Sequence, residues 1–230
     1  MSKVTNMFPL SIYKDKVEIE GQYKRQLVDK IFEMGQYDIR KASNIAWTGD
    51  VHKFDFLHGD PTFQKLFRCF AGPLLGYIEH LGVDSQKIDM YYTRSWATIS
   101  KENQNIPAHS HMQSHISIAY YLLKPANSGG IIFSHIGPPN EFSPNLFNSQ
   151  MFENKVLKED SAFNAKAALL DPEEGEILIF PSKTRHQTQE NKTPNVRISI
   201  SADIVVTLRE QANVEFLMPS ITRWGKVALS

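Results

Sequence analysis

Two histidines that stand two positions apart are the residues of this chain best suited to hold a metal ion. His109 and His111 occur in the segment His109-Ser-His111, just before an apolar run that starts at Ile116. Side chains alternate in direction along an extended segment, so both imidazoles point to the same side. Two adjacent imidazoles repel each other when both are protonated. A shared metal removes this conflict, because neutral imidazole is the commonest metal ligand. The spacing is therefore compatible with a metal site but does not by itself predict one.

A third histidine and an arginine extend this pattern. His186 follows the turn Pro181-Ser182, and eleven residues later Arg197 and Ser199 fall on one face of the last predicted strand. Each feature also has an ordinary structural explanation when it stands alone. H-x-H patterns occur without metal, and an arginine in a strand is usually solvated or paired with an acid. The prediction of a functional site therefore depends on the order in which these features occur together.

The elements that must position these residues are helices near the N-terminus and strands after it. Apolar residues recur at helical spacing over 21–34 and 60–82, and Pro73 is expected to kink or divide the second helix. Farther along, alternation with a period of two predicts strands at 88–99, 116–123, 130–134, 176–180 and 196–206. Short strands without intervening helices indicate an antiparallel sandwich or barrel. The long Pro/Asn/Ser-rich segment 136–164 is a candidate binding loop.

Length and composition limit the class of protein. The chain has 230 residues, which predicts a single domain over 1–230. Within it we expect a helical supporting region at 1–87, a β core at 88–206 and a C-terminal extension at 207–230. The 25 basic and 25 acidic side chains give a net charge of zero, so nucleic-acid binding by a general basic surface is not expected.

The compartment is predicted from the cysteine content and from the lack of targeting patterns. Cys69 is the only cysteine, so an internal disulfide is excluded and the chain suits a reducing compartment. We find no signal-peptide pattern and no apolar run near the roughly 20 residues that a spanning helix needs. We therefore expect a cytoplasmic protein with no membrane partner.

Taken in order, the motifs resemble the 2-oxoglutarate- and Fe(II)-dependent oxygenases. The most similar group is described as putative 2OG-Fe(II) oxygenases, which are related to prolyl-4-hydroxylase-like enzymes. The resemblance covers 88–206 well and the N-terminal third only loosely. It is carried by Phe8-Pro-Leu-Ser-Ile-Tyr13, Ser95-Trp96, His109-Ser-His111, 116–122, 128–133, 172–182, His186 and Arg197-Ile-Ser-Ile-Ser201. It implies a mainly β fold with N-terminal helices, namely a double-stranded β-helix (jelly roll, cupin-like) with the helices packed on one sheet.

The resemblance also implies an Fe(II) site. The family's centre has an H-x-D pair and a distal histidine, the facial triad of non-heme iron enzymes. His109 and His186 match its two histidines, and His111 stands where the family usually has the carboxylate. A site with three neutral imidazoles would carry one more unit of positive charge than the usual triad. No catalytic side chain beyond the metal ligands is predicted.

A second group of residues is expected to bind 2-oxoglutarate as co-substrate. Its distal carboxylate needs a cation of matching geometry, and Arg197 stands where the family places that arginine, with Ser199 on the same face. Tyr121 matches a tyrosine that donates to this carboxylate in the prolyl-hydroxylase-like branch. Its alternative role is that of a core aromatic with its hydroxyl bonded to the backbone. Ser117, at an even spacing from Tyr121, is expected to face the same interior.

Two further residues are expected to line the substrate end of the pocket. Trp96 lies on the strand before the H-x-H segment, and the alternative is that it is a buried core indole. His115 directly precedes the strand that begins at Ile116. Its alternatives are a supporting contact to a ligand and a place on the rim.

The resemblance thus implies a 2-oxoglutarate-dependent dioxygenase that hydroxylates an unidentified small molecule or peptide and releases succinate and CO₂. Two alternatives stay open: a cupin-like three-histidine metalloenzyme that does not use 2-oxoglutarate, and a non-catalytic jelly-roll binding protein. Only the first hypothesis requires a buried arginine at the end of the pocket remote from the metal, so Arg197 distinguishes them. Assembly into a homodimer is likewise left open.

Overall fold

The fold consists of two β-sheets with helices on the outer face of the larger one. The structure is a computed structural model and describes residues 3–36, 44–135, 137, 139–159, 161–210 and 216–228. The strands are β1 (Tyr13–Lys16), β2 (Trp47–Thr48), β3 (Ile88–Ser100), β4 (Ile116–Leu123), β5 (Ile131–Ser134), β6 (Ala167–Leu170), β7 (Glu176–Pro181), β8 (Arg185–Thr188) and β9 (Arg197–Leu208). The helices are α1 (Gly21–Gly35), α2 (Gln64–Cys69), α3 (Ala71–His80) and α4 (Ser149–Glu153), with 3₁₀ turns at Gly49–His52, Leu57–Gly59 and Ile221–Arg223.

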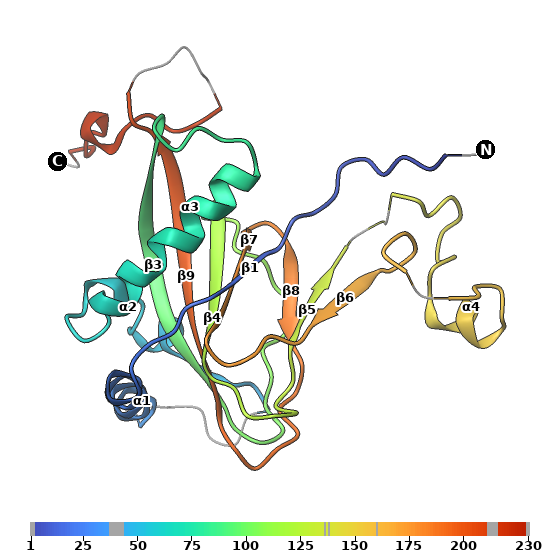
Figure 1. Ribbon diagram of the computed structural model, residues 1–230, viewed down its shortest axis with the longest axis horizontal. Helices are drawn as coiled ribbons and strands as arrows, with labels where there is room; N and C mark the ends of the chain where they lie inside the picture. Colours follow the sequence, from blue (N-terminus) through green and yellow to red (C-terminus); the bar gives the residue numbers. More distant parts are fainter. Residues whose placement is uncertain are drawn as a thin grey trace.

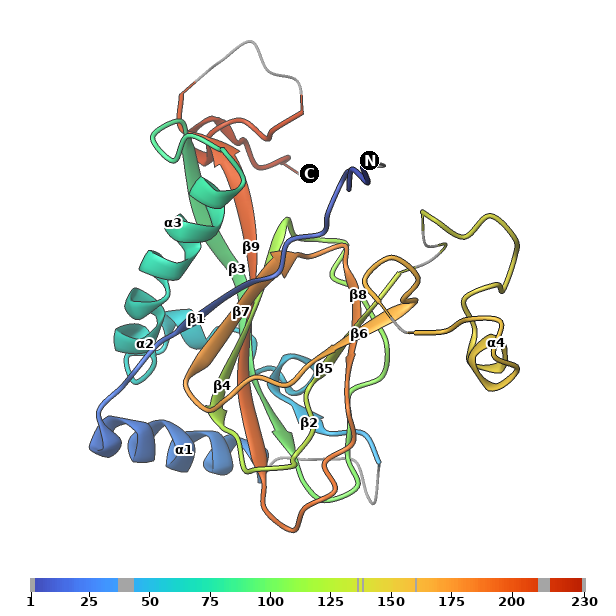
Figure 2. The same cartoon turned by 45° about the vertical axis from the view of Figure 1, so that its right-hand side comes forward.

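The large sheet has the strand order β1-β7-β4-β9-β3-β2, and the small sheet has the order β6-β5-β8. All neighbouring strands pair antiparallel. Helices α1, α2 and α3 lie along one side of the large sheet, and the small sheet lies on its other side (Figures 1 and 2). This arrangement confirms the expected double-stranded β-helix with helices packed on one sheet.

Alternation along β4 separates the helix-covered face from the inner face. Tyr120 and Leu122 point toward the helices and belong to the large apolar cluster, whereas Ala119 and Tyr121 belong to a small cluster between the sheets. A one-residue change of register would exchange these faces. The strand thus carries a structural surface on one side and a candidate functional surface on the other.

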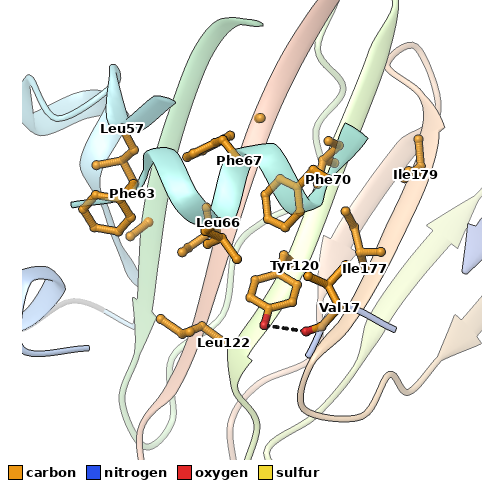
Figure 3. Packing of buried hydrophobic residues seen from close by; sticks show 14 of the residues in the cluster. Val17, Leu57, Phe63, Leu66, Phe67, Phe70, Tyr120, Leu122, Ile177 and Ile179 are labelled. Atoms are coloured by element: carbon orange, nitrogen blue, oxygen red, sulfur yellow. Dashed lines mark hydrogen bonds between the residues drawn. The ribbon is translucent and has the colours of Figure 1, made fainter. Parts of the chain in front are cut away.

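The large apolar cluster fixes the helices to the sheet. The ring of Phe70 lies 5.3 Å from that of Tyr120, and the Tyr120 hydroxyl donates a hydrogen bond of 3.0 Å to the Val17 carbonyl (Figure 3). Leu27 and Ile31 of α1 are also fully buried in this cluster. Burial of this apolar surface is the main source of stability for the helical region.

The predicted elements agree with most of the structure. Helix α1 confirms the helix predicted at 21–34, and β3, β4, β5, β7 and β9 confirm the five predicted strands. The helix predicted at 60–82 consists of two shorter ones that divide at Phe70, and Pro73 lies in the first turn of α3, where its missing N–H costs little. The segment 136–164 contains α4, although positions 136, 138 and 160 lie outside the described residues. Among the described helices, none is long and apolar enough to cross a bilayer.

Replacement of Phe70 by alanine tests whether the helices depend on this cluster. The side chain is fully buried, so Phe70→Ala should lower the free energy of unfolding by about 3–5 kcal/mol through lost burial and an unfilled cavity. Urea denaturation measures this change. Phe142→Ala is the control because Phe142 is 87% exposed, and it should change the free energy by less than about 0.5 kcal/mol. Equal effects of the two substitutions would contradict this description of the core.

Candidate metal centre and co-substrate pocket

Backbone pairing brings the three predicted metal ligands together. His109 and His111 lie in the segment before β4, and His186 lies in β8. The His109 and His186 backbones exchange two hydrogen bonds of 2.9 Å, and the His111 amide donates to the Ser182 carbonyl at 2.9 Å. Residues about 75 positions apart in the chain are thus held side by side by main-chain contacts.

The three imidazoles converge in the way that a metal site needs. One ring nitrogen of each histidine lies within 4.8 Å of those of the other two. Each Nδ1 is already hydrogen-bonded: that of His109 to the Pro107 carbonyl at 2.8 Å, and that of His186 to the Thr184 carbonyl at 2.8 Å. The Nδ1 of His111 bonds to a carboxylate, described below. The Nε2 atoms are therefore the ones left for a metal.

The surroundings keep these rings in the form that binds metal. Burial lowers the pKa of His186 to about 4, and the neighbouring imidazoles of His109 and His111 act in the same direction. Burial likewise lowers the pKa of His109 below its usual value, again with a contribution from His111. Neutral imidazole has a free lone pair, so both rings are ready to bind a metal near pH 7.

A buried aspartate that the sequence analysis did not identify supports His111. Asp203 of β9 is fully buried, and its Oδ1 lies 2.7 Å from the Nδ1 of His111. Ser114 and Ser117 also donate to Oδ1, at 3.2 and 3.3 Å, and the side-chain amide of Gln113 donates to Oδ2 at 3.2 Å. The sequence signal for Asp203 is its place two and four residues after Ser201 and Ser199, on the same face of the strand.

The register of β3, β9 and β4 arranges the inward-facing residues in three layers. Successive layers are two residues apart along each strand, which is about 7 Å. The first layer contains Thr98, Ser199 and Tyr121, the second contains Trp96, Ser201 and Ala119, and the third contains Arg94, Asp203 and Ser117. A cavity of about 440 Å³ extends along these layers and is also lined by the three histidines.

The first layer offers free hydroxyl groups to the cavity. Tyr121 is only 2% exposed, yet within the described part of the chain its hydroxyl makes no hydrogen bond. Burial raises the pKa of Tyr121 well above its usual value, with a smaller opposing effect of the Arg197 charge. The hydroxyl therefore stays protonated and can donate to a ligand. This environment favours the predicted ligand role over that of a core tyrosine bonded to the backbone.

Arg197 lies one step deeper than the first layer and is 2% exposed. Its Nη1 donates to the carbonyls of Ser128 and Gly129 at 2.5 and 2.8 Å. Its Nη2 donates to the Ser100 hydroxyl at 3.3 Å and the Gln189 carbonyl at 3.2 Å. The four terminal N–H groups thus have neutral acceptors, and among the described residues Arg197 forms no ion pair. The structure departs here from the expected fork toward a carboxylate, because only Nε–H is left for one.

The other predicted residues have different outcomes. Trp96 lines the cavity and its ring stacks on that of His111, with centroids 5.5 Å apart and planes 15° apart. Ser117 faces the cavity, but its hydroxyl bonds to Ser182 and Asp203, so it supports the metal side rather than the co-substrate end.

The expectation for His115 needs correction. This residue is exposed, its Nδ1 accepts from the Val206 amide at 3.0 Å, and it does not line the cavity.

Comparison with known proteins gives a family match for the β core. Residues 94–203 match the model of the family described as "Putative 2OG-Fe(II) oxygenase", and this segment contains the three histidines, Tyr121 and Arg197. The family matched by this segment is the one that the resemblance predicted. No curated protein sequence matches the chain at a significant level.

Several solved structures share the fold of this chain. The non-heme alpha ketoglutarate dependent epimerase SnoN from nogalamycin biosynthesis has a TM-score of 0.54 at 11% identity, covering 87% of this chain and 81% of that one. HygX from Streptomyces hygroscopicus, solved with nickel and 2-oxoglutarate, has a TM-score of 0.54 at 10% identity, covering 85% and 82%. A Pseudomonas putida prolyl-4-hydroxylase has a TM-score of 0.50 at 10% identity, covering 84% and 92%. At such identities the likeness concerns the fold.

Removal of one imidazole tests the metal centre. His186→Ala should abolish high-affinity binding of Fe(II), or of Ni²⁺ as a redox-stable probe, because two imidazoles leave the site incomplete. Isothermal titration calorimetry under anaerobic conditions measures the binding. His135→Ala is the matched control, since His135 is exposed and outside the cavity, and its affinity should equal that of the wild type. Retained affinity in His186→Ala would show that the metal binds elsewhere.

Proposed function

We propose that this protein is an Fe(II)- and 2-oxoglutarate-dependent oxygenase that hydroxylates an organic substrate and releases succinate and CO₂. One observation carries the proposal. Three imidazoles with free Nε2 atoms converge on one end of a cavity, and a buried guanidinium without a counter-ion among the described residues lies beyond its other end. A metal at the first end would use the three free Nε2 atoms, and a carboxylate near the second end would compensate the charge of the guanidinium.

The residues of the cavity suit a dicarboxylic keto acid. With a metal held by the histidines, the metal-side end of 2-oxoglutarate would lie next to them, and its distal carboxylate would lie toward the first layer. There the hydroxyl of Tyr121 can donate to it, with Ser199 and Thr98 beside it in register. Burying a carboxylate is costly unless donors and positive charge compensate it. Arg197 supplies the charge from behind these hydroxyls.

The metal and the protein have different roles in the proposed reaction. Bound Fe(II), with 2-oxoglutarate and O₂, supplies the oxidising chemistry. The protein binds the co-substrate, orients the substrate bond and excludes water. Trp96 covers His111 and so closes one wall of the metal site. The buried apolar side chains Ile131 and Phe180 form other parts of the wall and keep the centre dry.

The substrate end is supported by an ion pair on the cavity wall. The Nη2 of Arg94 lies 2.8 Å from the Oδ2 of Asp50, and the guanidinium lies 5.0 Å from the centre of the Trp96 ring. The Oδ1 of Asp50 is buried and has no hydrogen-bond partner among the described residues. A substrate with an N–H or O–H donor would satisfy this oxygen. Together with the neutral net charge, this favours a small polar molecule or a peptide over nucleic acid.

A second candidate is a cupin-like three-histidine metalloenzyme that does not use 2-oxoglutarate. The observation in its favour is that the terminal N–H groups of Arg197 are already bonded to protein acceptors. Anaerobic addition of Fe(II) and then 2-oxoglutarate distinguishes the two. The proposed function requires a visible charge-transfer band, whereas metal binding without the band supports the second candidate. Succinate release across candidate substrates then identifies the one that is oxidised.

The cellular location is part of the same proposal. We place the protein in the cytoplasm because its single cysteine, Cys69, is a free and exposed thiol, which suits a reducing compartment. A disulfide-linked form of the protein isolated from its native cells would contradict this placement.

Removal of the Tyr121 hydroxyl tests its contact with the co-substrate. Tyr121→Phe should weaken 2-oxoglutarate binding to the metal-loaded protein by about 10- to 100-fold, the value of a hydrogen bond to a charged group. The matched control is Tyr120→Phe, which alters the neighbouring residue on the helix-covered face and should leave this affinity unchanged. Titration of the charge-transfer band measures both. Equal affinities in the two variants would exclude Tyr121 from the co-substrate site.

Removal of the buried cation tests the electrostatic part of the proposal. Arg197→Ala should retain metal affinity but weaken 2-oxoglutarate binding by at least about 100-fold, because a buried carboxylate loses its compensating charge. Thermal unfolding of the same preparation separates this effect from loss of structure, since Arg197 also connects four protein acceptors. Unchanged 2-oxoglutarate affinity in a folded Arg197→Ala variant would favour the cupin-like candidate.

A further inference from the structure

The three histidines of the candidate metal centre differ in the group to which their Nδ1 atom is hydrogen-bonded. His109 and His186 each direct Nδ1 at a neutral backbone carbonyl, whereas His111 directs Nδ1 at the carboxylate of Asp203. His111 is also the residue that occupies the place of the carboxylate in an H-x-D pair. At this position the family usually has a carboxylate ligand. Here the ligand is a neutral imidazole, but a carboxylate is hydrogen-bonded to that imidazole.

Asp203 is a buried anion without a fixed cation. Its side chain is fully buried, and its partners are His111 and the neutral donors Ser114, Ser117 and Gln113. The other partner in its layer, Arg94, directs its guanidinium at Asp50 instead. Within the described part of the chain, no lysine or arginine forms an ion pair with Asp203. A buried carboxylate in this state is costly, and positive charge close to it would compensate the cost.

A metal ion bound through His111 would supply that charge at the distance of one imidazole ring. Carboxylate–histidine–metal arrangements of this kind fix the tautomer, orient the ring and increase the basicity of the ligand. The stacking of Trp96 on His111 at 15° between planes holds the same ring from its face. Its orientation is therefore determined by both contacts.

We propose that Asp203 is the charge-compensating positioning residue of this three-histidine centre, supplying through His111 the negative charge that an H-x-D pair places directly on the metal. The inference rests on the proposed function, because it assumes that the histidines bind Fe(II). It adds that the centre behaves electrostatically like a site with one carboxylate ligand. It also assigns the neighbouring hydroxyls of Ser114 and Ser117 to hold this carboxylate in place.

The first experiment removes the charge while keeping the shape. Asp203→Asn should weaken binding of Fe(II) and Ni²⁺ by about 10- to 100-fold, the usual effect of losing such a partner. The Fe(III)/Fe(II) midpoint potential should rise, because the more highly charged Fe(III) loses more stabilisation. Asp89→Asn is the matched control, since Asp89 is paired with Arg209 at 3.0 Å and lies outside the cavity, and it should leave the metal affinity unchanged. Wild-type affinity and potential in Asp203→Asn would overturn the proposal.

The second experiment moves the charge back to the metal. His111→Asp in the Asp203→Asn background puts a negative charge directly beside the metal position, as in an H-x-D pair. The double variant His111→Asp/Asp203→Asn should therefore bind metal at least about 10-fold more tightly than Asp203→Asn alone. With Asp203 present, two neighbouring carboxyl groups do not both stay ionised without a cation, so His111→Asp alone should raise the affinity by less. A general loss of structure in Asp203→Asn would not be restored by a second substitution. No recovery of metal affinity in the double variant would contradict the inference.

The failure of the proposed function gives a different result. A wild-type protein that binds neither Fe(II) nor Ni²⁺ at the histidines would refute the metal centre itself. Metal binding by the wild type together with no recovery in the double variant refutes only the role of Asp203. Calorimetry on the four proteins, with thermal unfolding of each metal-free form, distinguishes these outcomes.

Discussion

The pairing of β9 with β3 on one side and β4 on the other is the constraint on which the site depends. Residues face the cavity only at alternate positions, so a shift of one residue would turn every polar group in the three layers toward the helices. Irregularities in the register occur between Tyr92 and Arg94 and between Tyr121 and Leu123, at the two ends of the layered region. Such bulges re-aim side chains where regular pairing ends.

The two faces of the large sheet have different roles: one stabilises the fold, and the other carries the candidate site. The helix-covered face is apolar and fully buried, as Tyr120 and Leu122 of β4 illustrate. The cavity face carries hydroxyls, imidazoles and a carboxylate, whose burial costs free energy unless each finds a partner. Because the apolar face lies on the other side of the same strands, it stabilises the sheet independently of the cavity. The polar face can then keep groups such as the Tyr121 hydroxyl unpaired for a ligand.

Sequence patterns predicted the long elements and the histidines, because both depend on local spacing. Strands β2 and β8 are two and four residues long, and their pairing depends on tertiary contacts that no local pattern records. The same limit applies to the site. Asp203 matters because the register places it beside Ser117 and near His111, which are over 80 positions away. The acceptors of Arg197 are mainly backbone carbonyls, and these have no sequence signature.

The charges within the cavity explain how an H-x-H pair can serve where H-x-D is usual. In the usual centre the metal, the carboxylate ligand, the dicarboxylate co-substrate and the buried arginine sum to zero. This chain has a buried aspartate and a buried arginine at the same two ends, so the sum is also zero once metal and 2-oxoglutarate are present. A low-dielectric cavity tolerates charge when it is balanced locally. The identity of the metal's neighbours can therefore change while the electrostatic balance of the centre is kept.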